Sequence, residues 1–220
     1  MSKVTRTDSG DLEVFAAAVA HEIRTPLSAV AGEVEVALRR QRSAAEYREA
    51  LERIAAGVAE LVEISGDLTL LSDPPGHAGQ SRPASLDAIL SSLRTRYHGR
   101  DEVSIDATLP AGVRVAGNEP RLARAVVLII EHALRYRQGN AMVRLRAETM
   151  ATPRVRLIVE APPFGFWPRA WHWLAGSPRT AAGPLRLRTA LRIVEGGGGA
   201  LVADRASEME RVHIELQPTS

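Results

Sequence analysis

The chain has 220 residues, 45% hydrophobic and 25% charged, which is long enough for one large domain or two small ones with a packed core. It contains no cysteine, which excludes disulfides, zinc–thiolate sites and thiol nucleophiles. The net charge is only +2 and basic residues form no run, so we expect no nucleic-acid partner. No apolar stretch approaches the ~18 residues that a membrane span needs, so we expect a cytoplasmic protein with no membrane span.

The N-terminal third reads as two amphipathic helices. Thr7 to Ser9 offer N-caps for the first, and Ser43 with Glu46 forms a capping-box signature at the start of the second. Their apolar stripes are Val19, Ile23, Leu27, Val30, Val34 and Leu38, then Tyr47, Leu51, Ile54, Val58, Leu61, Leu68 and Leu71. The short connection predicts an antiparallel, all-α hairpin. One partner helix cannot cover a whole stripe, so we expect a homodimer that forms a four-helix bundle.

Residues 74–83 are predicted to be a linker, because the stretch from Ser72 to Pro83 is rich in proline, glycine and serine. The linker would separate a helical domain, residues 1–73, from a mixed domain, residues 84–217. Helices are predicted there at 85–97, 119–136 and 185–195, with a glycine stop at 196–199, and strands at 103–109, 113–115, 141–147, 155–161, 200–203 and 212–216. This order indicates an α+β two-layer sandwich with helices on one face of a mixed sheet.

His21 is the candidate reactive group of the first helix. It lies two residues from both Val19 and Ile23, about 200° around a helix, and should therefore point away from the packed stripe. A neutral imidazole has one nitrogen lone pair that can attack phosphorus. The neighbouring carboxylate of Glu22 can hold the proton on the other nitrogen. The alternative is an ordinary surface histidine.

Two later residues of the same segment add to this chemistry. Thr25 lies one turn beyond His21 on the outer face and has a hydroxyl that can orient a water molecule. Pro26 lacks a backbone donor and should kink the helix just past His21. A proline inside a helix costs about 3 kcal/mol, which suggests that the kink has a use. Otherwise Pro26 merely ends the helix.

The segment from His21 to Leu27, HEIRTPL, resembles the H-box of sensor histidine kinases. It is preceded by Phe15 and followed by a second amphipathic helix, as in that family. The resemblance implies that His21 is the phosphorylated histidine, that Glu22 is its acid/base neighbour and that Thr25 assists dephosphorylation of the partner, with Arg24 and Pro26 in supporting positions. It also implies a dimerisation and phosphotransfer hairpin followed by an ATPase domain of the Bergerat type.

Residues 84–217 resemble that ATPase domain in order and length, but the residues of its nucleotide motifs differ. Leu128 and His132 stand where the family's N-box has asparagines, and neither suits Mg²⁺, which prefers oxygen ligands. Ala161 replaces the aspartate that reads adenine. Pro184 interrupts the glycine-rich box, which in the family cradles phosphates with backbone amides. We therefore expect no cofactor and no metal on this chain, with Mg²⁺ held by a partner receiver domain.

The region between these boxes is unusually aromatic, with Phe164, Phe166, Trp167, Trp171 and Trp173. These side chains would either plug the vacated nucleotide pocket or form a docking surface for another protein. The combination of a phosphotransfer hairpin and an ATPase-like domain with decayed nucleotide motifs resembles the ChpT-type histidine phosphotransferases. This chain departs from them in keeping a full kinase-style H-box.

Three functions follow as hypotheses. The first is a phosphorelay protein that carries phosphate on His21 and exchanges it with response-regulator receiver domains, with an upstream histidine kinase as a further partner, and without ATP. The second is an active histidine kinase with an atypical pocket. The third is a non-catalytic pseudokinase scaffold that regulates a kinase through its hairpin. Labelling by ATP separates the second from the first, and the phenotype of His21→Ala separates the third.

Overall fold

The computed structural model of the protein describes residues 7–72, 83–107, 109–137, 139–150, 154–162, 184–206 and 209–219. The chain divides into two compact units, Met1–Ser72 and Asp73–Ser220. The predicted linker, 74–83, lies outside the described residues except for Pro83. Each unit is described below by itself.

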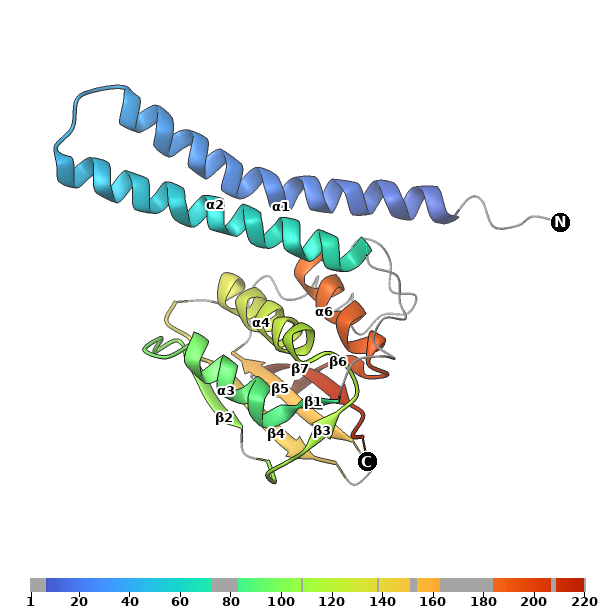
Figure 1. Ribbon diagram of the computed structural model, residues 1–220. Helices are drawn as coiled ribbons and strands as arrows, with labels where there is room; N and C mark the ends of the chain where they lie inside the picture. Colours follow the sequence, from blue (N-terminus) through green and yellow to red (C-terminus); the bar gives the residue numbers. More distant parts are fainter. Residues whose placement is uncertain are drawn as a thin grey trace. The chain divides into compact units, whose positions relative to one another are not determined.

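The first unit is an antiparallel hairpin of two long helices (Figure 1), as predicted. Helix α1 is Thr7–Leu38 and α2 is Ala44–Ser72. The predicted capping box is confirmed at the start of α2. The Ser43 hydroxyl accepts the main-chain N–H of Glu46 at 3.2 Å, and the main-chain N–H of Ser43 donates to the Glu46 carboxylate at 2.8 Å. Two otherwise orphaned donors of the helix start are thus satisfied locally.

Helix α1 does not bury the whole of its predicted apolar stripe. Helix α1 runs through Pro26 as one element, and Pro26 is the only buried side chain among residues 13 and 16–38, those of α1 whose burial is described. The next residue, Leu27, which belongs to the predicted stripe, is 52% exposed. Within one hairpin, large apolar side chains remain exposed at Leu27, Val34, Val36, Leu38, Tyr47, Leu51, Val58 and Val62. A single hairpin therefore leaves an apolar surface on both helices.

The second unit is built on a five-stranded mixed sheet. Its strands are β2 (Val103–Ala107), β4 (Val143–Thr149), β5 (Val155–Ala161), β6 (Ala200–Ala206) and β7 (Met209–Leu216). The strand order is β2-β4-β5-β7-β6, with β2 and β4 parallel and the other neighbours antiparallel. A separate two-stranded sheet joins β1 (Ala84–Ser85) to β3 (Arg114–Val115).

Helices α3 (Leu86–Arg96), α4 (Glu119–Tyr136) and α6 (Leu185–Gly196) cover one face of this sheet (Figure 1). Alternate residues of each strand point toward them, for example Leu157 and Val159 of β5 and Ile214 of β7, all of which belong to the core. Helix α4 matches the prediction at both ends, and its residues 125–130 are all buried. The predicted α+β two-layer arrangement is confirmed.

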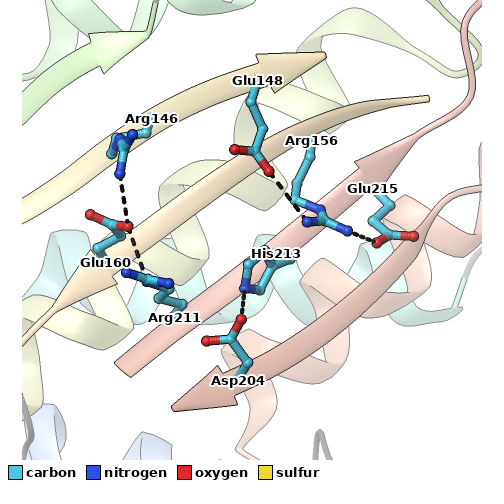
Figure 2. Close-up of polar contacts among 8 residues, drawn as sticks. All are labelled: Arg146, Glu148, Arg156, Glu160, Asp204, Arg211, His213 and Glu215. Carbon is cyan, nitrogen blue, oxygen red and sulfur yellow. Dashed lines mark hydrogen bonds and ion pairs between the residues drawn. The ribbon is translucent and has the colours of Figure 1, made fainter. Parts of the chain in front are cut away.

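Charged side chains lie on the other face of the sheet, in rows that cross the strands (Figure 2). The register places Glu148, Arg156 and Glu215 in one row, and Arg144, Glu160, Arg211 and Asp204 in a row four residues farther along β5; all of these except Arg144 are drawn in Figure 2. Neighbours in a row have opposite charge, and Arg156 bonds to Glu148 at 3.2 Å and to Glu215 at 2.8 Å. Such cross-strand pairs stabilise this face of the sheet.

Candidate functional site

His21 is exposed on α1, as the helical spacing predicts. Thr25, one turn later, is also exposed, and its hydroxyl donates to the main-chain carbonyl oxygen of His21 at 3.2 Å. The two residues therefore share one exposed stretch of the helix, and a hydrogen bond ties the threonine to the backbone that carries the imidazole. This geometry leaves the imidazole accessible to a second protein.

The neighbours of His21 divide between the surface and the interior. Arg24 is exposed, Glu22 is half-buried and Pro26 is buried. Since residues adjacent in a helix differ by about 100°, the side chains of Glu22 and His21 leave α1 about 100° apart. Pro26 cannot donate the usual hydrogen bond to the fourth residue before it, so the backbone ladder of α1 is interrupted one turn after His21.

The opposite wall of the hairpin contributes residues that the sequence reasoning missed. A Cβ atom on Gly57 of α2 would lie 2.5 Å from Cγ2 of Val30 and 3.7 Å from the carbonyl oxygen of Pro26. Arg53, one turn earlier on α2, forms a two-pronged pair with Glu33 of α1, at 2.9 and 3.0 Å. A lone glycine inside a helical pattern is the only sequence signal for the first contact, and nothing local marks the second.

The two N-box positions are filled by buried side chains. Leu128 is 1% exposed within the core cluster, and His132 is 3% exposed. Burial, with smaller effects from the charges of Arg186 and Arg135, lowers the pKa of His132 to about 3. The imidazole is therefore neutral at physiological pH, and its ring centroid lies 4.8 Å from that of Tyr136.

The remaining nucleotide motifs are described only in part. Ala161, in place of the adenine-reading aspartate, ends β5 and is 3% exposed. Pro184 is the N-cap of α6 and provides no side-chain cap hydrogen bond. The five aromatic residues predicted as a plug or a docking surface, Phe164 to Trp173, lie outside the described residues.

Other polar residues near α4 serve the fold. Asn118 caps the helix, since its side chain accepts the N–H of Arg121 at 3.1 Å. Glu131 accepts the hydroxyl of Tyr97 at 3.0 Å, and the desolvation of Tyr97, together with this carboxylate, raises the pKa of Tyr97. The bond between Tyr97 and Glu131 joins α4 to the C-cap of α3. Among the described residues, no helix is both long enough and apolar enough to span a membrane.

Comparisons with known proteins agree with this arrangement. The family model of the His Kinase A (phospho-acceptor) domain matches residues 11–75. The phosphate regulon sensor protein PhoR of Pseudomonas aeruginosa is 30% identical over 140 residues, which cover 60% of this chain and 31% of that protein. The signal transduction histidine-protein kinase BaeS of Escherichia coli is 27% identical over 204 residues, 86% of this chain and 43% of that protein. The chain thus spans less than half the length of these relatives.

Solved structures share the fold of both units. The histidine kinase AdeS of Acinetobacter baumannii matches with a TM-score of 0.60 at 16% identity, over 91% of this chain and 98% of that one. Histidine kinase ThkA, solved in complex with response regulator protein TrrA, matches with a TM-score of 0.60 at 16% identity, over 93% of this chain and 61% of that one. In its hairpin the chain matches the phospho-acceptor domain of histidine kinases, and in sequence and in the fold of both units it is similar to sensor histidine kinases.

Proposed function

We propose that this histidine-kinase-like chain is a phosphorelay protein that carries a phosphoryl group on His21 and exchanges it with receiver domains, without binding ATP. The observation that carries the proposal is a contrast between the two units. The H-box presents an exposed imidazole, whereas the positions that hold a nucleotide in the family have lost the groups needed for it.

The residues at the nucleotide positions do not fit a magnesium–nucleotide complex. Leu128 has no ligand atom and is enclosed in the core. His132 is a buried nitrogen donor, and Mg²⁺ selects oxygen. Ala161 has no side-chain acceptor for the adenine amino group. Each change removes a separate interaction, so weak binding at one position is not compensated at another.

The transfer itself requires only groups on α1 and on the partner. The lone pair of one imidazole nitrogen of His21 forms the N–P bond, while the bond between phosphorus and the partner's aspartate oxygen breaks and leaves a carboxylate. The carboxylate of Glu22 stabilises the positive charge on the ring by holding the proton of the other nitrogen. The reverse reaction returns the phosphoryl group to a receiver aspartate. Arg24, exposed one turn away, is placed to contact the acidic partner surface.

A homodimer is part of the proposal. The exposed apolar side chains of α1 and α2, such as Leu27, Leu51 and Val62, are the surface that a second hairpin would cover in a four-helix bundle. A receiver domain is the partner expected at His21. ThkA, which shares the fold, was solved with a response regulator, and an exposed imidazole requires no rearrangement to meet one.

An active kinase is the second candidate. The curated relatives are named as sensor proteins and a kinase, which favours autophosphorylation of His21 from ATP. The two candidates differ in one measurable respect, the source of the phosphoryl group.

The test offers two labelled donors to the whole chain. One is ATP with Mg²⁺, and the other is a panel of purified receiver domains charged with acetyl phosphate. We expect acid-labile, base-stable label from receivers and none from ATP, lost in His21→Gln and kept in His98→Gln, which alters another exposed histidine. Label from ATP establishes the kinase. No label from either donor, together with an unchanged cellular phenotype in His21→Gln, establishes a scaffold.

A further inference from the structure

The close approach of the two hairpin helices at Gly57 is the starting observation. In a typical helix pair, side chains keep the helix axes 8–10 Å apart. At Gly57 a Cβ atom would lie 2.5 Å from Cγ2 of Val30, a separation that real Cβ atoms do not show. The Val30 side chain of α1 therefore fills the space that a side chain at position 57 would need.

The site of this approach coincides with the break in the hydrogen-bond ladder of α1. The same Cβ position lies 3.7 Å from the carbonyl oxygen of Pro26, and the Pro26 side chain is buried. A helix bends most easily where proline removes a hydrogen bond. Gly57 thus faces α1 beside Pro26, where the hydrogen-bond ladder of α1 is interrupted.

A second contact sets the register of the helices at the same level. Arg53 and Gly57 are four residues apart on α2, so they lie on one face. Arg53 holds Glu33 through Nε at 2.9 Å and Nη2 at 3.0 Å, and this pair lowers the pKa of Glu33. A planar, two-pronged pair restricts sliding better than a single contact does. The two contacts therefore hold α1 and α2 in register and close together over residues 26–33 of α1.

We infer that Gly57 is a positioning residue for His21. The carbonyl of His21 accepts the Thr25 hydroxyl, Thr25 is bonded to Pro26, and the Pro26 carbonyl oxygen lies 3.7 Å from the place that a Cβ atom on Gly57 would take. A side chain at position 57 would press on Val30, push α1 away between Pro26 and Val30, and so tilt the turn that presents the histidine. Since a misplacement of about 1 Å can lower a rate about a hundredfold, this glycine governs transfer without touching the phosphoryl group. The inference rests on the proposed role of His21.

The matched variants are available in the same hairpin. Gly57→Ala introduces the clash, and Val30→Ala in the same chain removes Cγ2, leaving Val30 Cβ at 3.9 Å. Gly32→Ala on α1 and Gly66→Ala on α2 add the same methyl group where no atom lies within 4 Å. Both controls should unfold at a slightly higher temperature, because alanine favours helices more than glycine does.

The main measurement is the rate of phosphoryl transfer between His21 and a receiver domain, over a range of receiver concentrations and at a temperature where circular dichroism shows every variant folded. We expect Gly57→Ala to lower the maximal rate at least about tenfold, with the half-saturating receiver concentration unchanged within about twofold. Gly57→Ala/Val30→Ala should recover most of the rate, and the two controls should match the wild type. A maximal rate in Gly57→Ala equal to that of the controls, or no recovery in the double variant, overturns the inference.

An independent readout separates this inference from the proposed function. The ring proton resonances of His21, identified by their loss in His21→Gln, should shift in Gly57→Ala and return in the double variant, with no shift in Gly66→Ala. Unmoved resonances in Gly57→Ala overturn the positioning role. Shifted resonances in a chain whose wild type accepts no phosphoryl group leave the positioning role intact and overturn the proposed function instead.

Discussion

Thr25 and His21 are linked by a hydrogen bond from the threonine hydroxyl to the histidine carbonyl oxygen, with 3.2 Å between the oxygens. The donor hydrogen of Thr25 is thus turned inward, while a hydroxyl oxygen keeps lone pairs directed to solvent. The resting hairpin therefore presents Thr25 as an acceptor. To donate toward a receiver's phosphoryl group, the side chain has to give up a backbone bond of a kind that contributes little to helix stability.

The role of Thr25 can be tested by removing its hydroxyl without changing its shape. We predict that Thr25→Val lowers the rate at which the chain dephosphorylates a receiver by about tenfold or more, because no group then orients the water. Phosphorylation of His21 should stay within about twofold. Thr25→Ser keeps the hydroxyl and should behave as the wild type, both rates being followed by phosphate release and by label on the chain. Equal phosphatase rates in all three proteins would show that Thr25 has no part in hydrolysis.

The capping box at the start of α2 supports the hairpin from outside its apolar contacts. Ser43→Ala removes the acceptor for the Glu46 N–H, and we predict that it destabilises the hairpin by about 1 kcal/mol. The Glu46 carboxylate in turn accepts the main-chain N–H and the hydroxyl of Ser43, and these bonds lower the pKa of Glu46. The stabilisation from these two bonds is therefore present at neutral pH and is lost as acid protonates Glu46. Urea unfolding followed by helical circular dichroism measures both effects. Ser43→Thr, which keeps the acceptor, is the control.

The buried imidazole of His132 makes the second unit sensitive to acid. Its pKa in the folded chain is about 3, below the ordinary value for histidine, so the unfolded state binds the proton first. Stability should therefore be complete above about pH 6.5 and fall by up to roughly 1.4 kcal/mol per pH unit as the pH drops toward 3. His132→Leu should flatten this dependence relative to the wild type, whereas the exposed His98→Leu should not. Parallel profiles for wild type and His132→Leu would contradict the prediction.

The two arginines that pair with Glu160 on the sheet should contribute unequally to stability. Glu160 is only 6% exposed and lies between Arg211, 3.1 Å away in an ion pair without hydrogen-bond alignment, and Arg146, 3.4 Å away and 55% exposed (Figure 2). We predict that Arg211→Met costs roughly 1–3 kcal/mol, since it leaves a buried carboxylate poorly paired. Arg146→Met should cost less than about 1 kcal/mol, because its guanidinium is in solvent. Urea midpoints compare the two, and equal losses would refute the ranking.

Several element ends differ from the sequence prediction for reasons that involve pairing. The sequence predicts the last two strands at 200–203 and 212–216, with no strand between them. In the structure the hairpin extends by placing Asp204 opposite Arg211 and Arg205 opposite Glu210. Opposite charges in register prolong a ladder that apolar alternation alone does not reveal. The two-residue strands β1 and β3 are too short for periodicity, and β1 was missed.

The long helices, the mixed second unit and the H-box segment could be predicted from the sequence. These depend on spacing within a single element, such as the turn that separates His21 from Thr25 and the apolar period of α4. The packing of the two helices buries Pro26, brings Gly57 against Val30, and pairs Arg53 with Glu33 across the hairpin. Each of these contacts joins residues on different helices, and their separation is set by how the side chains between them pack, which no local pattern encodes.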